Sequence, residues 1–198
     1  MEIKVQQLSK VLLIAVLLSL LAGISGCAER NETMTAPDGP ATNQASSTDK
    51  TSRESYDEFV AQMDEILAVT GAQAGWTTEF SEPWPLEPGN VLTPEPCDVE
   101  NWRTSPYQLS LQVLGPGAED LQADRDAMIR YMEDQGLEVS GVFGDSSYPE
   151  RVAWNAFGRG ENGLTIDYGT SKDRRSVILQ GECSSHPSMQ NGVSRDAP

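Results

Sequence analysis

The sequence of 198 residues contains a single histidine, His186, and only three cysteines. Zinc sites draw most of their ligands from cysteine and histidine, and serine or cysteine nucleophiles usually depend on a neighbouring base. His186 follows Ser184-Ser185 in a polar stretch near the end of the chain, and no G-x-S-x-G motif is present. We therefore interpret His186 as a surface residue, and we expect no catalytic residue set, no metal and no cofactor.

Basic residues are also few, with 14 Lys and Arg against 30 Asp and Glu and a formal net charge of −16. Phosphate backbones and anionic membrane surfaces both repel a chain of this charge. We expect no nucleic-acid partner. The charge is explained by solubility alone, although it is also compatible with a cationic partner, whose binding would weaken with salt.

A long apolar run is missing as well. Residues 11–21 are almost entirely apolar, but a helix that spans a membrane needs about 20 such residues. Lys4 and Lys10 precede this run, small residues follow it, and polar sequence begins after Cys27. This order is typical of the basic, apolar and cleavage regions of a secretory signal peptide. A membrane-spanning anchor and an ordinary secretory signal with an incidental cysteine are the alternatives.

The tetrapeptide Ile24-Ser25-Gly26-Cys27 resembles the lipobox of bacterial lipoproteins. The resemblance implies cleavage between Gly26 and Cys27 and attachment of a diacylglycerol, with acyl chains such as palmitate, to the Cys27 sulfur. Two or more acyl chains give stable anchoring where one does not. The resemblance therefore predicts a protein that is lipid-anchored at the extracytoplasmic face of the cell membrane, with residues 1–26 as a lipoprotein signal peptide.

Cys97 and Cys183 remain when Cys27 is assigned to the lipid. An exported protein meets an oxidising environment, and two remaining cysteines allow only one pairing. We expect a disulfide between them, for which chain-entropy arithmetic gives about 4.5 kcal/mol of stabilisation. Two free thiols in a catalytic or metal site are the alternative.

Composition divides the rest of the chain. Residues 27–52 are polar and lack apolar periodicity, which predicts a disordered tether. The apolar periodicity of residues 53–187 predicts one globular domain, and the polar composition of residues 188–198 predicts a flexible tail. Ser55 and Glu58 match a capping box at the start of a first helix. Hydrophobic periodicity predicts helices over 55–70 and 119–135, and strands over 76–80, 107–114, 137–143, 151–157, 164–168 and 176–183. The fold class is α+β: an antiparallel sheet of about five strands, two helices on one face and one disulfide.

The segment 82–102 is rich in proline and cannot form a central strand or a helix. Long irregular loops are often functional. Trp76, Trp84 and Trp102 lie in or near this segment and form our candidate recognition surface, although packing against the sheet is the alternative for each. Residues 158–163 match G-x-G-x-x-G by letter, but they lie between two expected hairpin strands, so we interpret them as a turn.

The whole chain resembles the small LppA-like lipoproteins of high-GC Gram-positive bacteria. The shared features are a polar tether rich in Thr, Ser and Pro, an acidic α+β domain, and a cysteine pair that joins an early loop to the last strand. The sequence leaves open whether the chain is an enzyme and favours a non-catalytic role. The leading hypothesis is a non-catalytic binding or cell-envelope accessory module with an unknown envelope protein or ligand as its partner. The alternative is a hydrolase that acts on envelope polymers through two carboxylates.

Overall fold

The computed structural model describes residues 46–72, 74–144 and 153–196. All of them belong to one compact unit, Asn43–Pro198. The predicted signal peptide, the lipid attachment at Cys27 and most of the predicted tether lie outside the described residues. Among the residues that are described, no helix combines the length and the apolar character needed to cross a membrane.

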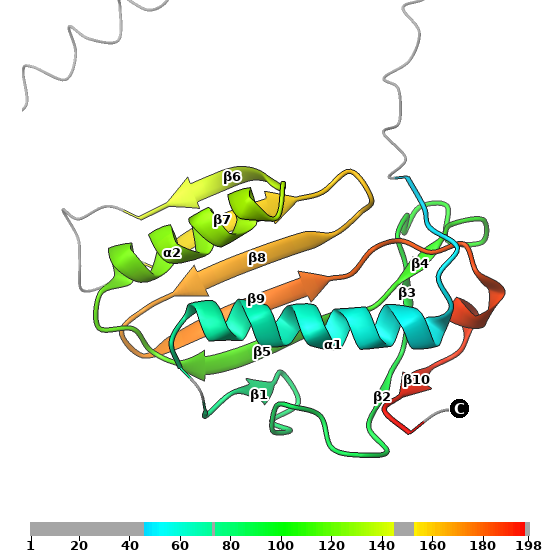
Figure 1. Cartoon of the computed structure of the whole chain (residues 1–198), viewed down its shortest axis with the longest axis horizontal. Coiled ribbons are helices and arrows are strands. Elements are labelled where there is room, and N and C mark those ends of the chain that lie inside the picture. The colour runs from blue at the N-terminus through cyan, green and yellow to red at the C-terminus, as the bar shows by residue number, and fades with distance from the viewer. Residues whose placement is uncertain (1–45, 73, 145–152, 197–198) are drawn as a thin grey trace, which may run out of the picture. The chain divides into compact units, whose positions relative to one another are not determined.

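Two helices, α1 (Ser52–Val69) and α2 (Leu121–Asp134), cover one face of the main sheet (Figure 1). The sheet has six antiparallel strands, which are, in spatial order, β1 (Thr77–Thr78), β5 (Ser110–Pro116), β9 (Arg174–Gln180), β8 (Thr165–Thr170), β7 (Trp154–Arg159) and β6 (Glu138–Phe143). The strands β6, β7, β8 and β9 pair in sequence order as successive hairpins. The earlier strand β5 pairs with β9, along the edge of β9 that faces away from β8. The predicted α+β class is confirmed.

The core lies between the helices and the sheet. Alternation buries one face of β5, β7, β8 and β9, as at Leu111 and Val113 of β5, whereas the edge strand β6 stays largely exposed. The inward-facing side chains of the sheet are buried against the apolar stripes of α1 and α2. The fully buried side chains of this core include Phe59, Met63, Ile66, Met128, Met132, Ile166, Tyr168, Val177 and Leu179. Burial of each such side chain contributes about 1.5–3 kcal/mol.

The first helix begins earlier than the sequence pattern suggests. Thr51 is the N-cap: its hydroxyl accepts a hydrogen bond from the Glu54 backbone N–H, and the Glu54 carboxylate accepts one from the Thr51 backbone N–H. Ser55 instead lies within the helix, where its N–H donates to the Thr51 carbonyl. Thr51-x-x-Glu54 and Ser55-x-x-Glu58 both match a capping box, and the one that lies first in the chain is used. Ser55 and Glu58 are therefore left to face outward.

Residues 46–52, which we expected in the tether, are hydrogen-bonded to the domain. The Ser46 N–H donates to the Glu161 carbonyl, and the Thr48 N–H donates to the Cys183 carbonyl. The Ser185 N–H donates in turn to the Thr48 carbonyl. These backbone hydrogen bonds hold residues 46–51, which we call the N-terminal strap, against the segment that follows β9. The domain contacts thus begin before the predicted boundary at residue 53.

The C-terminal segment also differs from the expected flexible tail over 188–198. A 3-10 helix, η1 (Pro187–Gln190), is followed by β10 (Val193–Ser194), which pairs with β2 (Val91–Leu92). Met189 and Val193 are 0% and 2% exposed. Two isolated apolar residues in a polar sequence show no periodicity, so the sequence pattern does not predict that they are buried. Their burial holds the C-terminal segment beside α1.

The disulfide between Cys97 and Cys183 is present, as predicted, with the two Cα atoms 6.2 Å apart. It fastens the proline-rich segment to the chain just beyond β9. That segment is irregular, as expected: beyond β2 it contains only β3 (Glu95–Pro96), which pairs with β4 (Tyr107–Gln108).

Candidate binding pocket

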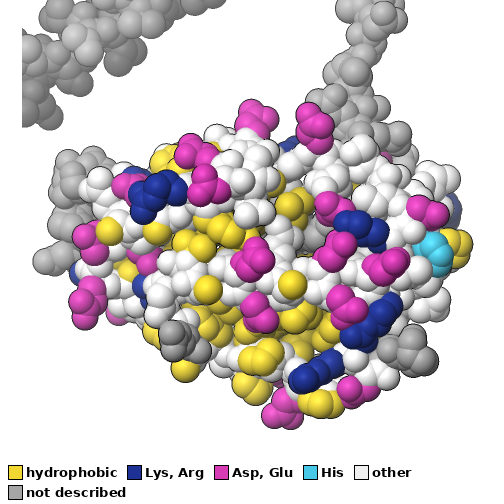
Figure 2. Space-filling model, in the orientation of Figure 1, with side chains coloured by type: hydrophobic (Ala, Val, Ile, Leu, Met, Phe, Trp, Pro, Cys, Tyr) yellow, Lys and Arg dark blue, Asp and Glu magenta, His cyan; other side chains and the backbone are white. Residues whose placement is uncertain are grey.

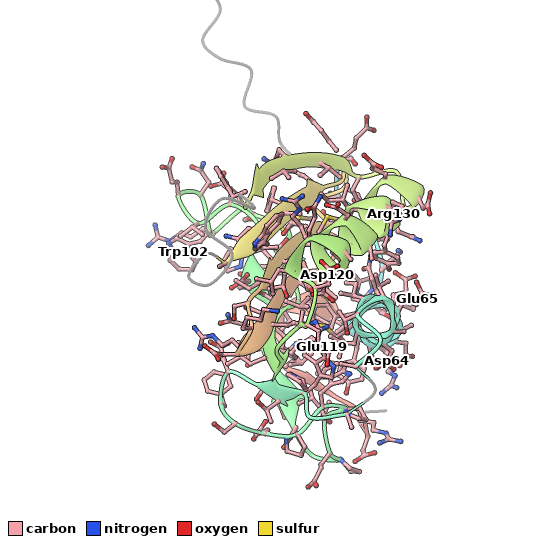
Figure 3. All side chains as sticks on the ribbon, turned by 90° about the vertical axis from the view of Figure 1, so that its left-hand side faces the viewer. Asp64, Glu65, Trp102, Glu119, Asp120 and Arg130 are labelled. Carbon is pink, nitrogen blue, oxygen red and sulfur yellow. A yellow bond between two sulfur atoms is a disulfide. The ribbon has the colours of Figure 1, made fainter. Side chains whose placement is uncertain are left out.

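The three tryptophans of the candidate recognition surface do not form one surface. Trp76 is only 5% exposed: its indole packs over Gly115, where any Cβ would clash with the ring, and its Nε1 donates to the Ala72 carbonyl. Trp84 is half-buried and donates to Asp64 of α1 at 2.8 Å. Trp102 is 51% exposed and lies on the other side of the sheet from Asp64 (Figure 3). Packing therefore accounts for Trp76, whose carbonyl also accepts a hydrogen bond from the Trp84 N–H.

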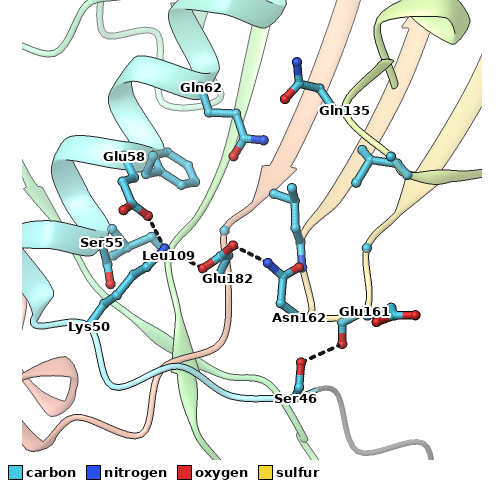
Figure 4. A pocket seen from close by; sticks show the side chains of 16 residues that line it. Ser46, Lys50, Ser55, Glu58, Gln62, Leu109, Gln135, Glu161, Asn162 and Glu182 are labelled. Atoms are coloured by element: carbon cyan, nitrogen blue, oxygen red, sulfur yellow. Dashed lines mark hydrogen bonds and ion pairs between the residues drawn. The ribbon is translucent and has the colours of Figure 1, made fainter. Parts of the chain in front are cut away.

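The main cavity lies elsewhere, beside the N-terminal half of α1, and has a volume of about 540 Å³. Its wall comprises the N-terminal strap, α1, the C-terminal end of α2, the turn between β7 and β8, and the residues after β9 (Figure 4). Segments from both ends of the domain thus meet at one place. The volume falls within the range of about 300–1,000 Å³ that is usual for small-molecule sites.

An ion cluster occupies one side of this pocket. Lys50 Nζ, from the N-terminal strap, contacts Glu58 Oε2 and Glu182 Oε2, each at 2.6 Å. Asn162 Nδ2 donates to the other oxygen of Glu182. Burial opposes the charged ammonium, but hydrogen bonds to Glu182 and Glu58 outweigh this effect and raise the pKa of Lys50 above its ordinary value. The only cation of the pocket lining is thereby paired with two carboxylates.

Other polar side chains of the lining are unengaged. Among the described residues, the hydroxyl of Ser55, the amides of Gln62 and Gln135 and the carboxylate of Glu161 have no hydrogen-bond partner. Gln62 extends from α1 and Gln135 from the end of α2, on two sides of the same space (Figure 4). The pocket therefore offers free donors and acceptors from two helices.

Apolar side chains form the floor of the pocket. Phe59, Leu109, Leu137 and Leu164 line it and are each less than a tenth exposed. Three glycines, at 136, 160 and 181, also line it. At Gly181 a Cβ would come within 3.3 Å of the Phe59 ring. The small residues leave the floor open, and the arrangement as a whole is apolar below and polar at the rim.

The local sequence explains how these side chains come together. Ser55, Glu58 and Gln62 recur at spacings of three and four, so one face of α1 presents all three. Gln135 is the C-cap of α2, and Gly136 follows it with a positive φ of 75°. The sequence pattern assigns Ser55 and Glu58 only to a helix cap, and it gives Gln62 no role. The polar row on α1, which flanks its apolar stripe, is the signal that could indicate the pocket.

Among the described residues, the lining of the pocket contains neither histidine nor cysteine. His186, half-buried, caps η1 by accepting a hydrogen bond from the Ser188 N–H. Within the described ranges, no group of histidine, cysteine, aspartate and glutamate side chains is arranged to hold a metal ion. What the pocket can supply is hydrogen bonds, an apolar floor and carboxylate charge.

Acidic side chains are spread over the helix face of the molecule, with fewer basic ones among them (Figure 2). A second, smaller hollow of about 240 Å³ lies on the opposite face of the sheet and includes Asp167, Asn155 and Arg174. Desolvation raises the pKa of Asp167 above its ordinary value. This hollow is smaller and, among the described residues, no helix contributes to its lining, so the pocket beside α1 is the candidate site.

Comparisons with known proteins add little. No protein-family model and no curated protein matches the sequence. Among solved structures, the chain is similar to the crystal structure of a DUF4853 family protein from Actinomyces odontolyticus, with 12% sequence identity and a TM-score of 0.36. The match covers 72% of this chain and 76% of that chain. This likeness carries no inference about function.

Proposed function

We propose that this protein is a lipoprotein, anchored through Cys27 at the extracytoplasmic face of the cell membrane, whose domain is a non-catalytic module that binds a ligand of the cell envelope. The observation that carries the binding role is the pocket beside α1. It combines an apolar floor with free amides from Gln62 and Gln135 and a fixed ion cluster. A pocket with a few convergent polar groups is the usual form of a ligand site.

The proposed anchor and the pocket are close in sequence. Ser46 lines the pocket, and Cys27 precedes it by a short polar segment. A disordered chain as short as the one that the composition predicts between them has a root-mean-square span of roughly 25 Å. The proposal therefore keeps the pocket near the membrane surface, within reach of envelope polymers that lie next to the bilayer.

Co-sedimentation with isolated cell-wall polymer tests the binding role. The full mature chain, solubilised in mild detergent, is expected to sediment with the polymer, and Gln62→Ala and Gln135→Ala are each expected to reduce the bound fraction. Gln122→Ala is the matched control, because Gln122 is an exposed residue of α2 outside the pocket. If both pocket variants sediment as the unaltered chain does, the pocket is not the binding site and the proposal fails.

A hydrolase remains the second candidate function because the carboxylates of Glu58 and Glu182 lie close to each other. Glu58 and Glu182 each lie 2.6 Å from the same Lys50 nitrogen, so their oxygens are at most twice that distance apart. Retaining glycosidases hold two carboxyl groups about 5–5.5 Å apart. The Lys50 ammonium lies between the two groups, however, and a reacting bond would have to displace it. Binding is for this reason the preferred function.

Product release distinguishes the two candidates. Under the binding proposal, the full mature chain releases no soluble fragments from cell-wall polymer, and Glu58→Gln changes nothing in that assay. Under the hydrolase alternative, fragments accumulate, and both Glu58→Gln and Glu182→Gln abolish their release.

A further inference from the structure

We infer that the ligand of the pocket is an uncharged, hydroxyl-rich molecule, namely a segment of a neutral glycan. The inference rests on the proposed binding function and names the class of ligand. Its support comes from three features of the lining: the charge balance, the kind of free hydrogen-bonding groups, and the position of the apolar side chains.

The charge balance excludes anionic ligands first. Among the described residues, the lining carries one cation, Lys50, and three carboxylates, those of Glu58, Glu161 and Glu182. Lys50 is already in contact with two of them. A phosphate or carboxylate of a ligand would therefore meet net negative charge and no available cation.

Cationic ligands are also disfavoured. Glu58 and Glu182 are neutralised by an ammonium that belongs to the chain itself, and a ligand amine would have to compete with that intramolecular contact. The remaining carboxylate, Glu161, is exposed at the rim, where water and salt weaken its attraction for a cation. A neutral ligand leaves the Lys50 cluster intact.

The free groups match hydroxyls. An amide side chain offers both a carbonyl acceptor and an NH₂ donor, and a hydroxyl both donates and accepts. Neighbouring hydroxyls on a sugar ring can therefore bind one amide through two hydrogen bonds. Gln62 and Gln135 present two such amides from different helices, and Ser55 adds a hydroxyl about two helical turns before Gln62 on the same face of α1.

The apolar floor suits the other part of a sugar ring. The C–H groups of a pyranose form apolar patches between its hydroxyls, and apolar surface is favourably buried against apolar surface. Leu137 and Leu164 lie at the floor, with glycines at 136 and 160 beside them. A ring that lies over these residues can direct its hydroxyls to the amides at the rim.

Titration calorimetry of the full mature chain tests the inference. The probes are neutral oligosaccharides (chitotetraose, maltotetraose and xylotetraose), a cationic probe (spermine) and an anionic probe (oligogalacturonate). We expect at least one neutral oligosaccharide to bind, with an affinity that is the same at low and high salt. Gln62→Ala and Gln135→Ala are each expected to weaken that binding by about tenfold, whereas Gln122→Ala leaves it unchanged.

Two results overturn the inference, and they are distinct from failure of the proposed function. If only spermine binds, with an affinity that falls as salt rises, the pocket is a cation site. If no neutral oligosaccharide binds while the glutamine variants still reduce sedimentation with cell-wall polymer, the pocket binds a ligand of another class. In both cases the binding role survives. If the variants affect neither assay, both proposals fail, and thermal unfolding of each variant shows whether its domain is intact.

Discussion

Asp124 of α2 and Arg175 of β9 form a buried, two-pronged ion pair. Arg175 Nε donates to Asp124 Oδ2 at 2.9 Å, and Nη2 donates to Oδ1 at 2.8 Å. The two side chains are 9% and 8% exposed. Arg175 Nη1 donates to the carbonyls of Pro116 and Gly117, and the Tyr168 hydroxyl donates to Asp124. One guanidinium thus connects α2 to the ends of two strands, and every group of the cluster has a partner.

Asp124→Ala is expected to reduce the free energy of unfolding by about 3–5 kcal/mol, because it leaves the Arg175 guanidinium buried and uncompensated. Urea denaturation followed by circular dichroism measures the change. Asp57→Ala is the control: Asp57 pairs with Arg53 at 2.6 Å, but its side chain is 57% exposed. An exposed pair of this kind contributes about 1 kcal/mol or less.

The joint replacement Arg175→Met with Asp124→Leu separates charge from packing. Exchange of a buried ion pair for apolar side chains of similar volume is often neutral or stabilising. The double variant is therefore expected to be more stable than Asp124→Ala alone.

If Asp124→Ala costs no more than Asp57→Ala, the buried pair does not stabilise the fold as we describe.

The same pair makes stability dependent on acid. Burial disfavours the Asp124 carboxylate, but hydrogen bonds from Arg175 and Tyr168 outweigh this effect and hold its pKa below the ordinary value of 3.8. The folded state thus binds a proton less readily than the unfolded state does. The stabilisation is complete above that ordinary value and is lost as the pH falls through the lower pKa of the folded protein.

Urea midpoints measured from neutral pH downward are expected to fall more steeply for the unaltered chain than for Asp124→Asn, with the difference confined to pH values near and below 4. Other acidic groups contribute to both curves equally, so the difference between the curves isolates Asp124. Parallel curves over the whole range would show that Asp124 does not carry this dependence.

The fold was largely predictable because it rests on periodic patterns. Alternation at Leu109, Leu111 and Val113 indicated a strand with one buried face, and the structure buries all three. The two cysteines left after Cys27 allowed one pairing, which the structure contains. The observed strand ends differ from the predicted ones by a few residues, because glycines and polar residues do not mark where backbone pairing stops.

The candidate site was not predicted, because the polar row on α1 is its one trace within a single segment and the rest of its lining depends on tertiary contacts. Glu182 and Lys50 meet only when the N-terminal strap lies against the residues after β9. Trp76 shows the converse error. An indole in a proline-rich region suggested recognition, but a neighbouring glycine at 115 allows the ring to be buried. Tertiary packing decided both cases.

Met189→Ala tests the packing of the C-terminal segment. Met189 is fully buried, so its truncation is expected to reduce the free energy of unfolding by about 2–5 kcal/mol. Val91→Ala is the control, because Val91 lies in the strand that pairs with β10 yet is 58% exposed. Its expected effect is within about 0.5 kcal/mol. If both variants lose the same small amount of unfolding free energy, the C-terminal segment is not packed as described, and the flexible tail predicted from the sequence is the better description.

The intact mass of the protein purified from membranes tests the proposed anchor and the disulfide together. We expect a chain that starts at Cys27 and carries a diacylglycerol, because the lipobox resemblance implies both. We also expect no alkylation before reduction and modification of Cys97 and Cys183 after it, since the two sulfurs are bonded. Cys27→Ser is the control and is expected to lack the lipid mass while it keeps the same alkylation pattern. A lipid-free mass for the unaltered chain would refute the anchor, whereas alkylation without reduction would refute the disulfide, so each failure is recognised separately.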